Sequence, residues 1–343
     1  MALAPVSRAA ESGEDVIATF LRDQGWGGAR QTPVQEDFSG RLYRRLHGEG
    51  GGPGAILMRM HRPPELKLFM NMQKLLEGYG IRVPAIHAVD FENGLALLED
   101  LGEARFDRLL NAEQSHEKLY PIAVDALVHL HQAAAQLDAT RLGVPHFNEK
   151  LFLEQVSLFL DVYGEKFLGQ PFPAATRAAF VEAWAPLKSA CAIAQSLIFR
   201  DCHAENILYL ANEKGHRRAG IIDFQDGGVG PVNYDLISLL EDARRDVPDD
   251  LRHRMTAYYL ERSKREEPAA FSASYPVVAA QRHLRVIAIT GRRWLEKGEP
   301  LVADYFRRSW RMLDRHSKTP ALAPLFTWLD QNVPEARRDV PPR

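Results

Sequence analysis

A predicted β-hairpin with polar side chains at one end constrains the fold of this chain more than any other feature. Apolar runs at 207–210 and 219–222 flank a polar segment at 211–216, a pattern that predicts two paired antiparallel strands. Asn206 precedes the first strand and Asp223 follows the second, so pairing brings both to the same end of the hairpin. Because amide and carboxylate oxygens are ligands of Mg²⁺, the sequence predicts a metal site there.

Asp201 lies five positions before Asn206, and this spacing is typical of a phosphoryl-transfer catalytic loop followed by its metal-binding aspartate. We expect Asp201 to orient an acceptor hydroxyl and take its proton. Asn206 and Asp223 would hold Mg²⁺ against the phosphates of ATP. In the alternative interpretation, the same residues only cap turns and strand ends, as aspartate and asparagine often do.

The composition is that of an ordinary globular protein of one large or two smaller domains. The chain has 343 residues, 45% of them hydrophobic, and a formal net charge of −2, which gives no electrostatic reason to expect nucleic acid or an anionic membrane as partner. With two cysteines, Cys191 and Cys202, a disulfide framework is not expected. No apolar run reaches the length of a membrane span, and residues 1–14 lack a signal-peptide pattern. These features predict a cytoplasmic protein, and the phosphoryl-transfer interpretation adds a small-molecule acceptor as its partner.

The pattern along the chain predicts an α+β fold of two lobes. A leading helix at 16–21 precedes a strand-rich region from 30 to 101 that contains one helix at 64–77. From residue 106 onward the chain is mostly helical outside the hairpin, with helices expected at 125–137, 149–163, 174–194, 233–245, 276–294 and 301–316. We therefore expect a small β-rich lobe at 1–101, a connector near Glu99 and Leu101, and a larger helical lobe at 102–343. ATP would lie in the cleft between them.

With these residues in view, the chain resembles the aminoglycoside phosphotransferase-like branch of the protein-kinase-like fold, from about residue 38 to residue 313. The branch's Asp-x-His-x-x-Asn loop, its metal-binding Asp and its later Gly-x-x-x-Tyr-Asp-Leu segment are matched by Asp201, His203, Asn206, Asp223 and the segment 230–236. Segments 58–65, 223–226, 234–240 and 281–287 are similar to the anomeric sugar kinases. This resemblance implies ATP- and Mg²⁺-dependent phosphorylation of the 1-hydroxyl of N-acetylmuramate or N-acetylglucosamine, for cell-wall recycling.

The chain departs from the family pattern where ATP phosphates would be bound. Phe199 replaces a largely architectural histidine, which leaves the chemistry intact. The strand lysine is absent, and Arg59 is its nearest match, although a surface strand position is the alternative. No clear glutamate partner for that cation follows, and Glu65 is the best nearby carboxylate.

Two glycine-containing segments compete for the role of phosphate loop. Ser39 and Gly40 lie between two strand-like runs, where backbone amides could cover the phosphates. The segment 48–54 is richer in glycine but precedes a strand, so we interpret it as a hairpin loop.

Several further polar residues are candidates for the site, and for some of them the sequence leaves two interpretations open. Asp226 binds a sugar hydroxyl or steadies the metal loop, or else it caps a turn. Asp235 anchors the helix near 233 and bonds back to the catalytic loop, and His203 braces that loop or contacts phosphate. Arg282, with Gln281, His283 and Arg285 on one helix, lines an acceptor pocket or lies on an exposed face. His129 and His131, two apart on a helix, are expected to be packing residues.

Other functions remain open from the sequence. An aminoglycoside, choline or other hydroxyl kinase shares the same catalytic loop. A nucleotide-binding scaffold of the pseudokinase type is favoured by the missing lysine, but the presence of Asp201, Asn206 and Asp223 together argues against it. The interval between Asp223 and Asp235 is too short for the activation loop of a eukaryotic-type protein kinase.

Overall fold

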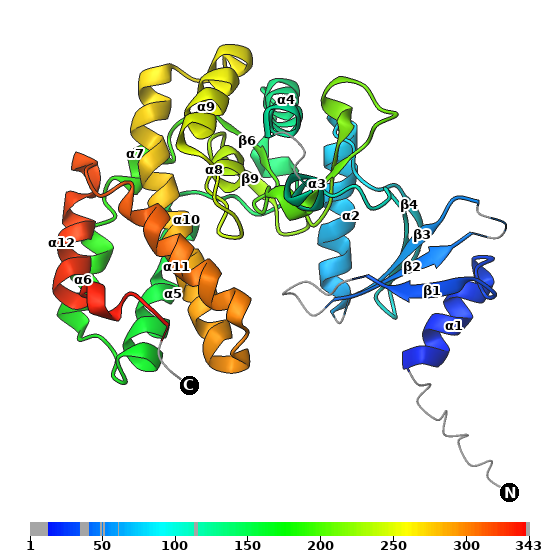
Figure 1. Cartoon of the computed structure of the whole chain (residues 1–343), viewed down its shortest axis with the longest axis horizontal. Coiled ribbons are helices and arrows are strands. Elements are labelled where there is room, and N and C mark those ends of the chain that lie inside the picture. Colours follow the sequence, from blue (N-terminus) through cyan, green and yellow to red (C-terminus); the bar gives the residue numbers. More distant parts are fainter. Residues whose placement is uncertain are drawn as a thin grey trace, which may run out of the picture.

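A five-stranded antiparallel sheet forms the amino-terminal part of the computed structural model, which describes residues 13–34, 41–48, 50, 52–60, 62–112 and 116–340. The strands follow the spatial order β1-β2-β3-β5-β4 and lie apart from the helical part (Figure 1). Their bounds are β1 (Arg30–Pro33), β2 (Leu42–His47), β3 (Ala55–Arg59), β4 (Ile86–Asp90) and β5 (Leu95–Glu99). The predicted 48–54 loop joins the paired strands β2 and β3 and is confirmed as a hairpin connection.

The two faces of this sheet pack against different helices. Helix α1 (Gly13–Asp23) covers one face, where Leu46 and Leu57 form a small apolar core with it. Helix α2 (Pro63–Gly78) covers the other face, where Met58 and Leu98 join the core shared with the carboxy-terminal part. Because neighbouring side chains of a strand point to opposite faces, this packing fixes which residues of β2 and β3 face α1 and which face α2 and the carboxy-terminal part.

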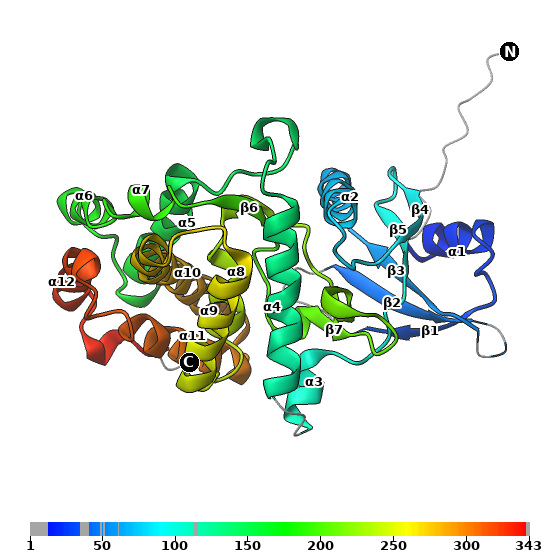
Figure 2. The ribbon, with the colours of Figure 1, turned by 90° about the horizontal axis from the view of Figure 1, so that it is seen from above.

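Helices dominate the remainder of the chain, with α4 running between the amino-terminal sheet and the other helices (Figure 2). The helices are α3 (Phe106–Asn111), α4 (His116–Ala133), α5 (Glu149–Asp161), α6 (Ala174–Glu182), α7 (Leu187–Ala190), α8 (Tyr234–Leu240), α9 (Asp249–Ser263), α10 (Pro268–Lys297), α11 (Pro300–Asp314) and α12 (Ala323–Asn332). Two small antiparallel pairs lie among them, β6 (Gln195–Ile198) with β9 (Gly228–Pro231), and β7 (Ile207–Tyr209) with β8 (Ala219–Ile221).

The core of the helical part surrounds α10. Its buried face packs against α5, α7, α8 and α11, and an aromatic cluster of Phe159, Tyr163, Phe306 and Trp310 fills the space between α5 and α11. Helix α10 ends at Gly298, whose φ of 66° is the left-handed conformation that glycine adopts at low cost. In the described part of the chain, no helix is both long and apolar enough to span a membrane.

Most predicted elements are present, but several boundaries were wrong. The predicted helix at 174–194 is two helices, α6 and α7, because Pro186 cannot donate the backbone hydrogen bond that a continuous helix requires. The predicted helix at 233–245 ends at Leu240. Helix α10 begins at Pro268, eight residues before the expected start, and contains Pro276. Helices α3, α9 and α12 and strands β1, β6 and β9 were not predicted individually.

Candidate active site

The β7–β8 hairpin, residues 207–221 and called the catalytic hairpin below, brings Asn206 and Asp223 together, as the sequence predicted. Ile207 pairs with Ile221, and the backbone N–H of Ile222 donates to the carbonyl of Asn206 at 3.0 Å. The Asn206 side-chain nitrogen donates to the backbone carbonyl of Asp201 at 3.0 Å and lies 3.4 Å from Oδ2 of Asp223. Three residues separated by up to 22 positions in the chain therefore meet at one end of two paired strands.

The chemistry of this cluster fits Mg²⁺. Asn206 and Asp223 offer amide and carboxylate oxygens, which are the hard ligands that this ion prefers. The backbone of Asp223 has a φ of 58°, an uncommon left-handed conformation for a residue other than glycine. Such backbone strain is found preferentially at functional sites, where surrounding contacts hold it in place.

Asp201 has a carboxylate that is free to accept a proton. Its side chain makes no hydrogen bond or ion pair with any other residue that the structure describes. Burial raises the pKa of this carboxyl, but the guanidinium groups of Arg285 and Arg200 outweigh that effect and hold the pKa below its usual range. Asp201 is therefore ionised at neutral pH.

His203 lies buried beneath the same loop. One ring nitrogen, Nε2, lies 3.2 Å from the side-chain nitrogen of Asn206, whereas Nδ1 has no hydrogen-bond partner among the described residues. Burial lowers the pKa of the imidazole well below its ordinary value, so the ring is neutral. This placement favours bracing of Asn206.

Asp235 anchors the strand that leads into the catalytic loop. Its carboxylate accepts hydrogen bonds from the backbone N–H groups of Phe199, at 2.6 Å, and Arg200, at 2.8 Å. The predicted contact between this helix and the catalytic loop is thus confirmed. Burial raises the pKa of Asp235 to about 7, although the two backbone donors favour the ionised form. Arg200, with a φ of 72°, is the second strained residue of the site.

Arg282 lies in the core behind the loop. Its guanidinium donates to the hydroxyl of Ser238 at 2.8 Å, and that hydroxyl lies 3.4 Å from the carbonyl of Arg200. Gln281, Arg282, His283 and Arg285 are all buried, so the alternative that they form an exposed helix face is wrong. Within the described part of the chain, hydrogen bonds link Arg282 to the catalytic loop through Ser238, and its charge also lowers the pKa of Asp201.

The expectation for Arg59 is not supported by its position. Its side chain points to the α1 face of the sheet, where the guanidinium donates to the carbonyl of Gly13 at 3.2 Å. The β3 residue on the opposite face is Met58, which is fully buried against α2. Strand alternation therefore directs Arg59 away from the catalytic hairpin. Ser39 and Gly40 lie outside the described residues.

Arg41 occupies the site in a way that the sequence analysis missed. Its guanidinium is 3.1 Å from Oδ1 of Asp223 and 3.6 Å from Oδ2 of Asp226, and its side chain is 8% exposed. Asp226 itself is about half exposed. Gln225, also missed, donates to Oδ1 of Asp223 at 2.6 Å. Arg41 directly follows the predicted phosphate loop, and that adjacency was the available signal.

The connector between the sheet and the helical part lies on the catalytic hairpin. Arg82 accepts a hydrogen bond from the N–H of Ile221 at 2.8 Å, and its side chain pairs with Glu99. The side chain of Leu101 lies against Gly220, 3.0 Å from the position of an added Cβ. Glu99 and Leu101 are thus fixed beside the β8 strand that ends near Asp223.

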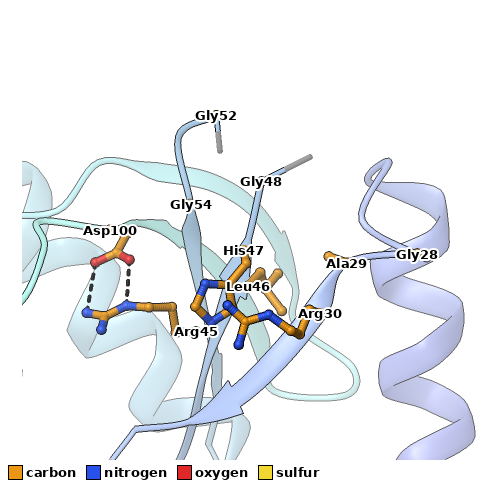
Figure 3. A pocket seen from close by; sticks show the side chains of 10 residues that line it. All are labelled: Gly28, Ala29, Arg30, Arg45, Leu46, His47, Gly48, Gly52, Gly54 and Asp100. Atoms are coloured by element: carbon orange, nitrogen blue, oxygen red, sulfur yellow. Dashed lines mark hydrogen bonds and ion pairs between the residues drawn. The ribbon is translucent and has the colours of Figure 1, made fainter. Parts of the chain in front are cut away.

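A separate cavity lies at the outer end of the sheet. It has a volume of about 550 Å³, and Figure 3 shows the Arg45–Asp100 ion pair on one side of it. The residues that line it are Gly28, Ala29, Arg30, Arg45, Leu46, His47, Gly48, Gly52, Gly54 and Asp100, none of which belongs to the catalytic cluster.

The described residues contain one other group with metal-ligand chemistry, Glu241 with His283 and His316, and it is buried. Both imidazoles lie within hydrogen-bond distance of the same carboxylate oxygen, at 2.6 and 3.0 Å. Arg252 lies 3.6 Å from the other oxygen. Because a guanidinium at that distance repels a second cation, we interpret this group as a hydrogen-bonded ion cluster. His131 is also a packing residue, as expected, bonded to Tyr259 at 2.7 Å.

Comparison with known proteins agrees with this geometry. The model of the phosphotransferase enzyme family matches residues 30–271, more than half of the chain. An N-acetylmuramate/N-acetylglucosamine kinase of Caulobacter vibrioides is 30% identical, over 95% of this chain and 98% of that protein.

Solved structures share the fold at low identity. The GDP complex of aminoglycoside 2'-phosphotransferase-IIIa has a TM-score of 0.59 at 15% identity, covering 89% of this chain and 98% of its own. The ternary complex of APH(2")-IIa with streptomycin and ATP has a TM-score of 0.57 at 13% identity, covering 93% and 98%. The predicted kinase-like α+β fold is thereby confirmed. The chain belongs to the phosphotransferase enzyme family and is a kinase that uses an alcohol group as acceptor.

Proposed function

We propose that this protein transfers the γ-phosphoryl group of ATP, with Mg²⁺, to the anomeric hydroxyl of an amino sugar such as N-acetylmuramate or N-acetylglucosamine. The observation that carries the proposal is the contact of Asp201, Asn206 and Asp223 at one end of the β7–β8 hairpin. The name of the Caulobacter relative supports the acceptor, and the ATP complex of a protein with the same fold supports the donor.

The reaction requires little from the protein beyond positioning and charge. The acceptor oxygen attacks the γ-phosphorus, the bond from that phosphorus to the β–γ bridging oxygen breaks, and ADP leaves. Asp201 orients the hydroxyl and takes its proton. Because the pKa of Asp201 is held below its usual range, the carboxylate is ionised and able to accept this proton. Mg²⁺, held through oxygens of Asn206 and Asp223, would neutralise charge on the phosphates.

The nucleotide would lie between two lobes, residues 1–101 and 102–343. The role of Ser39 and Gly40 as a phosphate loop stays a prediction from the sequence. Glu99 and Leu101 lie beside the nucleoside, since the connector crosses the catalytic hairpin at Gly220. His203, Asp235 and Arg282 hold the catalytic loop from behind, and Asp226 faces the phosphates from the loop after Asp223.

A buried cation near Asp201 favours an acidic acceptor. Arg285, on α10, is 8% exposed and makes no hydrogen bond or ion pair within the described part of the chain. The carboxylate of Asp201 compensates part of this buried charge, since Arg285 lowers its pKa, and an anionic acceptor would add a second compensating group. The carboxylate of N-acetylmuramate has that charge, whereas N-acetylglucosamine, a choline or an aminoglycoside does not.

The test is a panel of acceptors with Mg-ATP, with products identified by phosphorus NMR. We expect a sugar 1-phosphate from N-acetylmuramate and N-acetylglucosamine, and a loss of about 10²- to 10⁴-fold in Asp201→Asn, the usual range for a lost general base. A product phosphorylated at another hydroxyl would refute the anomeric assignment. Turnover of choline or an aminoglycoside alone would establish the second candidate, another hydroxyl kinase.

A further inference from the structure

Strand β3 has no cation on the sheet face toward the catalytic hairpin, where a kinase strand would place one for the phosphates. On β3 that face carries Ile56 and Met58, both apolar, and Arg59 points to the other face. ATP brings several negative charges into the site, and two of the groups proposed to surround it, Asp201 and Asp223, are anionic as well. A cation from another element of the sheet is therefore needed close to the phosphates.

Arg41 is a cation on this face of the sheet, and its guanidinium lies close to Asp223. It precedes β2 by one residue, and strand alternation puts it on the same face as Tyr43, whose side chain packs against the core that contains Met58. Its guanidinium crosses from the sheet to the loop after β8, where Asp223 and Asp226 lie within 3.1 and 3.6 Å. The side chain of Arg41 is 8% exposed, whereas those of Asp223 and Asp226 are 27% and 53% exposed, so the cation is buried but its carboxylate partners remain open to solvent.

We propose that Arg41 binds the β- and γ-phosphates of the nucleotide and exchanges the two carboxylates for phosphate oxygens when Mg-ATP binds. The proposal rests on the nucleotide-dependent function proposed above. A guanidinium fork fits carboxylate and phosphate geometry equally well, so Arg41 can change partners without losing charge-assisted hydrogen bonds. A divalent cation at Asp223 repels the guanidinium from that carboxylate, and the phosphates offer it the nearest new anion.

The experiment is equilibrium binding of ATP, ADP and AMP, each with MgCl₂, measured by calorimetry on wild type and Arg41→Gln. We expect the variant to bind ATP and ADP roughly 10- to 100-fold more weakly, the range for a lost hydrogen bond to a charged group. AMP affinity should change less than threefold, because AMP lacks the phosphates that Arg41 contacts. Arg41→Lys, which keeps the charge and loses the fork, should give a smaller loss.

Arg44→Gln is the matched control, since Arg44 lies three residues further along, in β2, and pairs with Glu14 on the opposite face. It should bind all three nucleotides as wild type does. If Arg41 only blocks the metal site, Arg41→Gln will bind Mg-ATP as tightly as wild type or more tightly, and the proposal is overturned. If wild type binds neither ATP nor ADP, the nucleotide-dependent function fails together with it.

Discussion

Replacement of Asp235 by alanine tests whether this carboxylate holds the catalytic loop in place. The carboxylate is completely buried and accepts the backbone N–H groups of Phe199 and Arg200 at 2.6 and 2.8 Å. A buried donor without a partner costs about 1–3 kcal/mol, so two donors cost about 2–6 kcal/mol. The substitution also removes a carboxyl group whose burial is unfavourable and raises its pKa to about 7, and this gain offsets part of the cost of the two unpaired donors. We expect a net loss of about 2–4 kcal/mol in the free energy of unfolding at pH 7.

The same substitution should lower turnover in the protein that remains folded. Asp235 holds the N–H of Arg200, whose backbone has the left-handed φ of 72°, and Asp201 is the next residue. A shift of about 1 Å at a catalytic group can reduce turnover by about 10²-fold. Urea unfolding followed by circular dichroism gives the stability, and turnover is measured well below the midpoint of unfolding.

The control for this experiment is Asp246→Ala, which removes an exposed aspartate that pairs with Arg308 and Arg311. Exposed pairs of this kind contribute at most about 1 kcal/mol, and turnover should be unchanged. Our reasoning is refuted if Asp235→Ala loses no more stability than this control and keeps its turnover.

Three further substitutions test separate parts of the site and of the core. Asp223→Ala should abolish Mg²⁺-dependent turnover with folding intact, and residual activity that still responds to Mg²⁺ would contradict its role. Arg285→Gln should lower kcat/KM for N-acetylmuramate by roughly 10-fold relative to N-acetylglucosamine, as for a lost charged hydrogen bond, and an equal loss for both sugars would exclude carboxylate recognition. Burial lowers the pKa of His131 to about 3, so its contribution to stability is complete above pH 6.5 and is lost as the pH falls toward 3. His131→Phe should remove roughly 5 kcal/mol of that acid sensitivity, and an unchanged dependence of unfolding free energy on pH would show that His131 is not its source.

The chemistry of the catalytic cluster could be predicted because its members are close in sequence. Asp201, Asn206 and Asp223 are linked by one hairpin, and pairing of two strands determines where the ends of a hairpin lie. The same holds for α2 and for the paired strands β2 and β3, whose apolar patterns and turn residues are local. The contact of Asp235 with the catalytic loop could also be predicted, since its segment follows the hairpin in the sequence.

The partners of the arginines were decided only by the tertiary structure. Arg41 meets Asp223 across 182 positions, and Arg59 faces α1 because the register of β3 places Met58 on the other side. The order of polar and apolar residues in β3 could not show which side chain faces the hairpin, since Met58 and Arg59 are neighbours and either could do so. The burial of Gln281, Arg282 and His283 was hidden for a similar reason: α10 is enclosed by helices far apart in the chain, and polar residues there find partners that no local pattern shows.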